Sequence, residues 1–345
     1  MTELLRELCS VYGIAGADED IRAFIIEKAK AAGADEVRTD ALGNVLAFRK
    51  GRQPRKAPAV LISHMDEAGF KVNKINDDGT ASVSRVGDTD PVCWLGQRVV
   101  IGKKHIPGAF CIPGLKRRES ETYIPAAADL LLDAGPITAA GAGRFMAVDD
   151  GVFLDGSFTE MPNGLLKGRA FDSRIGCAVL LSLMEEEPEF DTWFAFTCRD
   201  SIKFRGSGRG TEVVLRGLEP AFAAFVESRD AFDFEEVPAN RRNLTLGRGC
   251  GVILAESRSA YSRPLRQYLL QKAGEESIPY QTGTRQDTEV PVSARSNAAG
   301  GTLCICLAAP VRYLKSAAPV VQKTDLTALK DMCGLFIRET EAFNG

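Results

Sequence analysis

Hydrophobic residues recur along this chain at two different spacings, and each spacing predicts a different kind of element. Spacings of three and four residues predict helices near the start, as at Ile21 and Ile25, and again in the second half, as at Ile175 and Val179. Continuous apolar runs predict buried strands in the segments "PAVLIS", "TWFAFTC", "AFAAFVES" and "GTLCICLAAP". Because strands and helices alternate, the pattern indicates an α/β fold.

The pattern of hydrophobic and polar residues changes between about Lys71 and Pro162. There the chain consists of short β-patterned runs that Gly, Pro and Asp interrupt, with one helix-like stretch at 126–133. Such runs are typical of a small, barrel-like β unit. We therefore expect an α/β domain made of residues 1–68 and 163–345, interrupted by a β-rich insert of residues 69–162.

Composition and charge exclude several classes of protein. The net charge of -3 gives no long-range attraction for nucleic acid or an anionic membrane. No apolar run approaches the roughly 18 residues of a membrane span, and the acidic start does not resemble a signal peptide. None of the nine cysteines forms a C-x-x-C pair. We expect a cytoplasmic protein with reduced thiols that binds neither nucleic acid nor membrane.

Polar residues follow the predicted strands at their carboxyl ends. His64 and Asp66 end the first buried strand, and their H-x-D spacing points both side chains to one face. In that arrangement the imidazole can bind a metal while the carboxylate orients the ring. Further polar groups follow the later strands, namely Asp172, Asp200, Ser201, Glu227 and Lys315.

Two interpretations of these polar groups remain open at this point. The carboxyl ends of parallel strands meet at one edge of a sheet, so the groups are expected to converge in one site. Each carboxylate taken singly also fits a structural role in a loop or at a helix start. Asp172, which precedes a predicted helix, has the position of an N-cap.

Four segments together carry a resemblance to a known family. They are "LISHMDEAGFKV", "LKGRAFDSRIGCAVLL", "FAFTCRDSIKFRGSG" and "PVRYLKS", and they resemble the glutamyl-aminopeptidase and tetrahedral-aminopeptidase metallopeptidases, some of which are labelled cellulase M or endoglucanase. Their order and spacing match over nearly the full chain, including an inserted β-rich domain. The resemblance implies a phosphorylase-like or zinc-exopeptidase-like three-layer α/β/α domain with a smaller barrel-like insert.

The resemblance also implies a site with two divalent metals, an aspartate that bridges them, and a glutamate base that activates the bridging water. His64 matches the histidine of the first metal, Asp66 the aspartate that supports this histidine, and Asp172 the bridging carboxylate. Glu227 falls where the family has an aspartate ligand. By this resemblance, these residues can together bind one divalent ion, with zinc, cobalt and manganese as candidates.

The positions for the second metal depart from the family pattern. Asp200 and Ser201 stand where the family has two glutamates, of which the first is the base and the second a metal ligand. Lys315 stands where the second metal's histidine is expected. A protonated lysine has no lone pair, and a serine hydroxyl is a poor substitute for a carboxylate. We expect the second metal to be absent and the Lys315 ammonium to pair with Asp172 and Asp200.

Three functions are compatible with the sequence. In the first, the protein has lost efficient peptidase chemistry and binds a peptide, a small molecule or a partner such as an active paralogue. Asp200 is one methylene shorter than glutamate, and a misplacement of about 1 Å can cost on the order of 10²-fold in rate. The resemblance further implies a homo-oligomer, either a dimer or a larger assembly.

The second function is an active mononuclear metallo-aminopeptidase, with His64, Asp172 and Glu227 as ligands and Asp200 as base. The third function is glycoside hydrolysis, which the endoglucanase label suggests and which needs two carboxylates that flank a sugar bond. It ranks lowest because the chain has only two tryptophans and no evident aromatic platform for a sugar.

Overall fold

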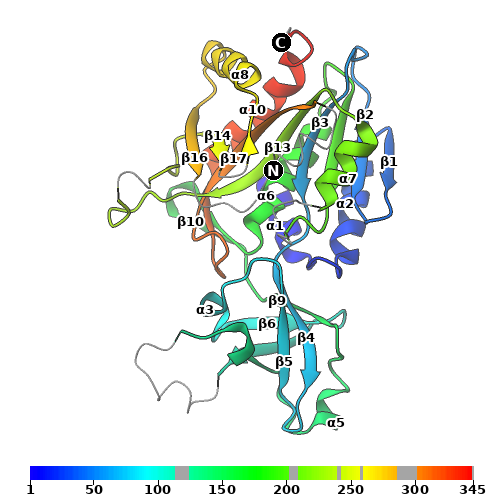
Figure 1. The fold of residues 1–345 in the computed structure, drawn as a ribbon, viewed down its shortest axis with the longest axis vertical. Helices are drawn as coiled ribbons and strands as arrows, with labels where there is room; N and C mark the ends of the chain where they lie inside the picture. Colours follow the sequence, from blue (N-terminus) through cyan, green and yellow to red (C-terminus); the bar gives the residue numbers. More distant parts are fainter. Residues whose placement is uncertain (113–123, 202–208, 239–241, 257–258, 286–300, 344–345) are drawn as a thin grey trace.

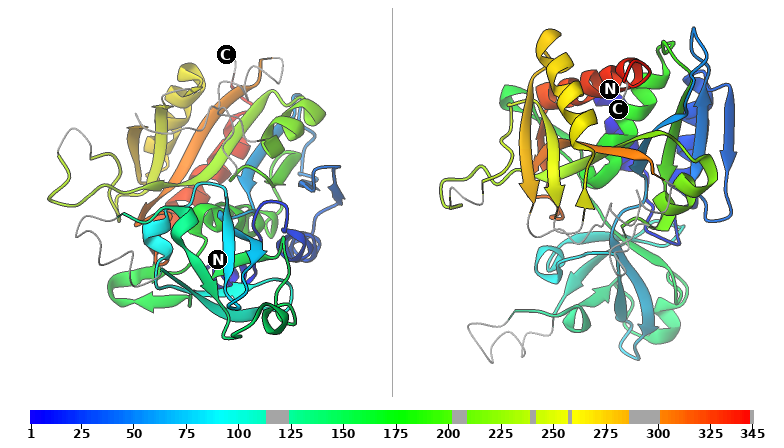
Figure 2. Two further views of the ribbon diagram at one scale, coloured as in Figure 1. Left: turned by 60° about the horizontal axis from the view of Figure 1, so that its bottom comes forward. Right: turned by 45° about the horizontal axis from the view of Figure 1, so that its top comes forward.

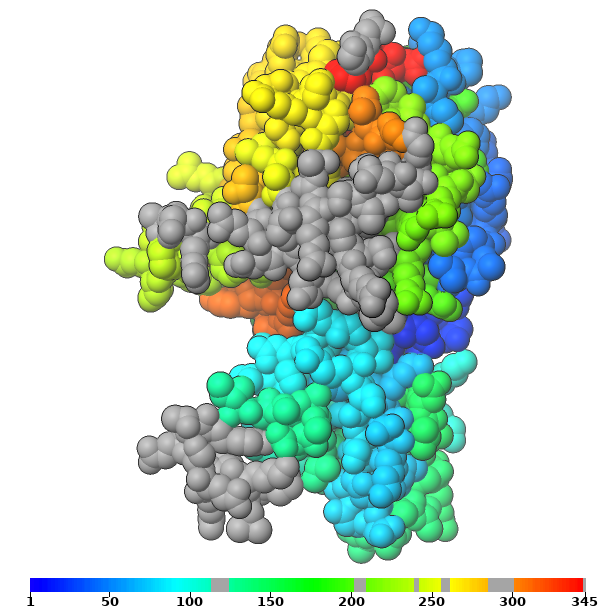
Figure 3. Space-filling model, in the orientation of Figure 1, coloured from blue at the N-terminus to red at the C-terminus, as the bar shows by residue number. Residues whose placement is uncertain are grey.

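The computed structural model describes residues 1–112, 124–201, 209–238, 242–256, 259–285 and 301–343 of the 345. A large sheet with helices on both faces makes up the upper part of the molecule, and a small barrel lies beneath it (Figure 1). In the space-filling view the barrel forms a lobe of its own (Figure 3).

The main path of the large sheet has four parallel strands at its centre. They are β12 (Thr192–Thr197), β3 (Ala59–His64), β13 (Phe222–Asp230) and β17 (Leu303–Arg312), in this spatial order. On one side follow β2 (Val45–Arg49) and β1 (Glu36–Thr39). On the other side follow β18 (Val320–Gln322), β11 (Leu165–Lys167) and β10 (Thr159–Met161).

Three further strands, β14 (Cys250–Glu256), β15 (Ser259–Ala260) and β16 (Tyr280–Arg285), branch from β17. The central strands are apolar almost throughout because helices cover both faces of the sheet. In β3, for example, every residue is buried up to the terminal His64.

One face of the sheet carries the larger hydrophobic core. The helices α1 (Thr2–Ser10), α2 (Glu19–Ala31), α6 (Phe171–Met184), α8 (Arg263–Glu275) and α10 (Lys323–Glu339) contribute to it. Ile175 and Val179 of α6 are fully buried there, as their spacing predicts. Helix α7 (Arg209–Leu218) packs on the opposite face through Val214 and Leu215. The expected three-layer α/β/α arrangement is therefore confirmed.

The barrel consists of six antiparallel strands, closed in the order β4, β5, β8, β7, β6 and β9. Their bounds are Gly69–Ile75, Ala81–Val86, Leu131–Asp133, Ile106–Cys111, Arg98–Ile101 and Gly151–Leu154. Phe70, Trp94 and Phe110 pack edge to face at its centre, with ring centroids 4.9 to 5.9 Å apart. The predicted barrel-like insert is confirmed as an element of the fold.

Short helices connect the strands of the barrel. They are α3 (Pro91–Trp94), the 3₁₀ helix η1 (Ala127–Asp129) and α5 (Ala139–Ala142), and the 3₁₀ helix η2 (Pro162–Gly164) follows β10. The chain leaves the barrel after Leu154 and enters the large sheet at Thr159. The two lobes are seen from further directions in Figure 2. The domain limits at residues 69 and 162 stay a prediction.

All nine cysteines lie in the described part of the chain and are free thiols. Burial raises the pKa of the Cys9, Cys177 and Cys250 thiols to about 12, so these thiols stay protonated and unreactive near neutral pH. None of the described helices combines the length and the apolar character that crossing a membrane requires.

Candidate functional site

The residues selected from the sequence gather around one pocket of about 90 Å³. It lies at the carboxyl ends of β12, β3 and β13, where the large sheet faces the barrel. Of the seven predicted residues, six line the pocket: His64, Asp172, Asp200, Ser201, Glu227 and Lys315. The barrel contributes Asp88, Thr89 and Trp94 to its wall.

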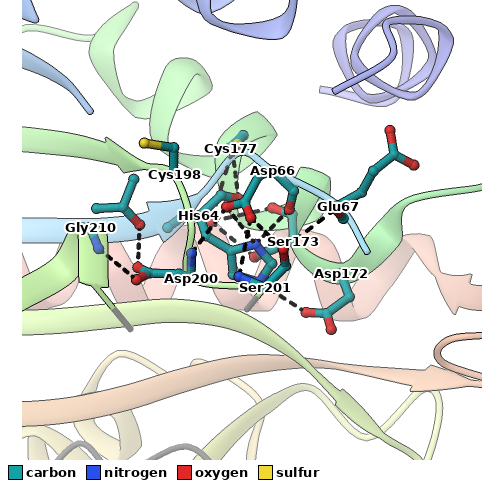
Figure 4. A network of polar contacts seen from close by, with 12 residues as sticks. His64, Asp66, Glu67, Asp172, Ser173, Cys177, Cys198, Asp200, Ser201 and Gly210 are labelled. Atoms are coloured by element: carbon teal, nitrogen blue, oxygen red, sulfur yellow. Dashed lines mark hydrogen bonds and ion pairs between the residues drawn. The ribbon is translucent and has the colours of Figure 1, made fainter. Parts of the chain in front are cut away.

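His64 ends β3 and is held at both ring nitrogens. Its Nδ1 donates to the backbone carbonyl of Asp66 at 2.8 Å, and its Nε2 lies 3.3 Å from Oδ1 of Asp172 (Figure 4). Burial by itself would lower the pKa of His64. The hydrogen bond and charge of Asp172, with the charges of Asp66 and Glu227, outweigh burial and raise the pKa to about 9. The surrounding carboxylates thus favour the protonated form of the imidazole.

The Asp66 side chain organises the turn that follows β12. Its carboxylate accepts from the backbone N–H of Asp200 at 3.4 Å and of Ser201 at 3.2 Å, and from the Ser201 hydroxyl. Its nearest oxygen lies 3.9 Å from Nδ1 of His64, so the backbone carbonyl of Asp66 is what orients the ring. Burial, with the charge of Asp200, raises the pKa of Asp66 to about 6, against His64 and the bonds from Ser201.

The Asp200 carboxylate is turned toward the N-terminus of α7. It accepts from the backbone N–H of Gly210 at 3.1 Å and of Thr211 at 3.2 Å, and from the Thr211 hydroxyl. The Thr197 hydroxyl adds a fourth donor at 2.6 Å. A carboxylate has about four lone-pair sites, and a helix N-terminus favours negative charge. Asp200 therefore anchors α7 to the end of β12.

Lys315 reaches from the segment after β17 toward the barrel. Its ion pair is with Asp88 of the barrel, and not with the expected Asp172 and Asp200. The reason is that Asp172 already faces His64 and the Asp200 carboxylate is bound to α7. The pair joins the two units of the fold across the pocket. The sequence did not reveal Asp88, because no local pattern links it to Lys315.

Arg229 is a second cation in the pocket, and sequence analysis missed it. It lies two residues after Glu227 on β13, and both residues are buried, at 5% and 7% exposure. Nη1 of Arg229 donates to Oε2 of Glu227 and, at 3.0 Å, to the carbonyl of Ser228. The alternation of side chains along a strand could have found it, because residues two apart share a face.

A buried cluster of charged side chains lies next to the site, around Glu67. Glu67, next to Asp66, accepts from both terminal nitrogens of Arg169 at 3.1 Å and from Arg174 at 3.4 Å. Its carboxylate also accepts from the backbone N–H of Gly13 at 3.2 Å. The cluster ties the segment after β3 to the start of α6 and to the N-terminal region.

The described side chains do not by themselves make up the donor set that the resemblance implies. His64 and Asp172 are close enough to share one ion, but the carboxylate of Glu227 is bound by Arg229. Within the described ranges, no group of three His, Cys, Asp or Glu side chains is arranged to hold a metal ion. A catalytic zinc site needs three protein ligands.

Comparison with known proteins identifies the family. A family model described as M42 glutamyl aminopeptidase matches residues 43–332. The chain belongs to the M42 family. This is a family of divalent-metal-dependent aminopeptidases. Among curated relatives, the lysyl aminopeptidase of Pyrococcus furiosus is 24% identical over 341 residues, which cover 94% of this chain and 93% of the relative.

Solved structures show the same fold. An aminopeptidase from the archaeon Desulfurococcus kamchatkensis superimposes with a TM-score of 0.90 at 23% identity, covering 98% of this chain and 94% of the other. The TET1 peptidase of Pyrococcus horikoshii, described as assembling into a tetrahedron or a large octahedral shell, has a TM-score of 0.84 at 23% identity, covering 97% and 98%. At these identities the likeness establishes the fold.

Proposed function

We propose that this M42 protein binds a peptide or a protein partner in its pocket and does not carry out efficient metal-dependent hydrolysis. The observation that carries the proposal is the orientation of Asp200, which stands at the position of the family's general base. Its carboxylate accepts from four donors at the ends of β12 and α7.

A general base needs a free lone pair within hydrogen-bonding distance of the proton that it removes. The lone pairs of Asp200 are directed at α7 and at Thr197 of β12 instead. The two positions that would serve the second metal have structural partners as well, since Ser201 donates to Asp66 and Lys315 pairs with Asp88. These contacts support the proposal that the pocket is retained, while hydrogen bonds and ion pairs between side chains take the place of the metal chemistry.

The proposal includes assembly into a homo-oligomer, a dimer or larger. Support comes from the TET1 peptidase of the same fold, which is described as a tetrahedron or an octahedral shell. An active paralogue is a further candidate partner. Light scattering on the purified chain, alone and mixed with such a paralogue, tests both parts, and a monomer in both samples would contradict them.

A binding and cleavage experiment tests the proposed function. The protein is dialysed against a mixture of short peptides in the presence of zinc, cobalt or manganese, and bound and free peptides are identified by mass spectrometry. We expect bound peptides to be recovered intact. Asp172→Ala, inside the pocket, should reduce their retention, whereas Asp149→Ala, at an exposed ion pair with Lys71 outside it, should not. Release of N-terminal amino acids that a chelator abolishes would contradict the proposal.

A further inference from the structure

We infer that the guanidinium of Arg229 replaces the metal cation at the first metal position and keeps divalent ions out of the set His64, Asp172 and Glu227. This inference rests on the proposed function, because it names the group that makes the pocket independent of metal. The sequence comparison with the family points only to the second metal, through Ser201 and Lys315. Arg229 adds a departure from the family pattern at the first metal position as well.

The position of Arg229 on β13 is the first argument. Glu227 and Arg229 lie two residues apart on one strand, so their side chains leave the same face of the sheet. Both line the pocket together with His64 and Asp172. The guanidinium is bound directly to Oε2 of Glu227, the carboxylate that a first metal would need as its third protein ligand.

The charge of Arg229 is the second argument. A buried carboxylate needs a compensating cation, and in a metalloenzyme the metal ion supplies it. Here the side-chain exposures of Glu227 and Arg229 are 9% and 6%, and the compensating charge comes from the chain itself. The guanidinium stays protonated at all accessible pH values and has no lone pair, so it cannot become a ligand.

Covalent attachment is the third argument. A metal ion can dissociate and exchange, but a side chain two residues away remains beside the carboxylate. A second bond, from Nη1 to the Ser228 carbonyl at 3.0 Å, holds the guanidinium in place. A divalent ion entering next to it would meet a buried positive charge. Among the described residues it would have His64 and Asp172 as donors, one fewer than a zinc site requires.

Metal content measured on matched variants tests the inference. Wild type, Arg229→Met and Arg312→Met are loaded with zinc, dialysed and analysed for zinc per chain. Arg312 is the control because it also pairs with a carboxylate, that of Asp233, away from the pocket. We expect only background zinc in wild type and Arg312→Met. Arg229→Met should hold about one zinc per chain, which adding His64→Ala should remove.

Thermal unfolding with and without zinc gives a second measurement that does not depend on activity. Arg229→Met removes the guanidinium that is bonded to the Glu227 carboxylate, so this variant should unfold at a lower temperature, and zinc should raise its Tm. Zinc should leave the Tm of wild type and Arg312→Met unchanged. An Arg229→Met chain that fails to fold even when refolded in zinc would overturn the inference, as would a folded variant that binds none.

The outcomes separate this inference from the proposed function. Wild-type protein that binds zinc through His64 without cleaving peptides overturns the inference and leaves the proposed function standing. Wild-type protein that binds zinc and cleaves peptides overturns both. Zinc-free wild type together with a zinc-free, folded Arg229→Met overturns the inference alone.

Discussion

Glu227 and Arg229 form a buried ion pair on one face of β13, at the edge of the sheet where the pocket opens. Among the described residues, two further pairs line the pocket, Lys315 with Asp88 and His64 with Asp172. In a dinuclear metallopeptidase, metal ions provide the positive charge at such carboxylates. Among the described side chains, an arginine, a lysine and a histidine lie beside these carboxylates.

The role of Asp200 as an anchor of α7 leads to a stability prediction. Asp200→Ala removes the acceptor for the Gly210 and Thr211 N–H groups and should lower the free energy of unfolding by about 1–3 kcal/mol. Denaturant unfolding measures the change. The exposed Glu36 of β1 gives the control, since it pairs with Arg38 in solvent and Glu36→Ala should change stability by less than about 0.5 kcal/mol. An unchanged stability in Asp200→Ala would show that its carboxylate is free for another role.

The ion pair of Lys315 with Asp88 is expected to couple the barrel to the large sheet. Both side chains are about one-third exposed, at 32% and 38%, so the coupling in a double-mutant cycle should be small, about 0.5–1 kcal/mol. It should weaken as salt is added. The cycle compares Lys315→Ala, Asp88→Ala and the double variant by thermal unfolding. Strictly additive effects of the two single changes at low salt would contradict the pairing.

The buried Asp325 leads to a prediction about pH. Burial raises its pKa to about 6, although the N–H groups of Gly247 and Gly249 donate to it and oppose the rise. The folded state therefore binds this proton more tightly than the unfolded state, in which the pKa is about 3.9. Stability from this group is present below about pH 4 and is lost as the pH rises toward 6.

Unfolding midpoints measured across this range for wild type and Asp325→Asn check the prediction. The wild type should lose stability between about pH 4 and pH 6 more steeply than the variant. Asp66, with a pKa of about 6, contributes a similar slope in both proteins and so cancels in the comparison. Parallel curves for the two proteins would contradict the assignment to Asp325.

Much of the framework could be predicted from the sequence. Uninterrupted apolar runs such as that of β3 occur where a parallel strand is covered on both faces, and polar residues at the ends of such strands converge on one edge. His64, Asp172 and Glu227 accordingly line one pocket. The barrel was predictable because short runs broken by Gly and Pro cannot form long helices.

The side-chain contacts could not be predicted in the same way. Asp88 comes from another unit of the fold, and its distance from Lys315 depends on how the barrel docks on the sheet. The direction of the Asp200 carboxylate depends on where α7 begins. The sequence does not fix that point, so it leaves open whether Asp200 is a base or an anchor for the helix. The position of Arg229 could have been predicted, because the alternation of side chains along a strand places it on the same face as Glu227.

Metal-dependent hydrolysis by the wild-type chain tests the central claim most directly. Aminoacyl fluorogenic substrates are incubated with protein loaded with zinc, cobalt or manganese, before and after a chelator is added, with His64→Ala as the reference. The account predicts that wild type and His64→Ala give the same background rate and that the chelator changes neither. A chelator-sensitive rate that His64→Ala abolishes would contradict it and would identify a working metallo-aminopeptidase.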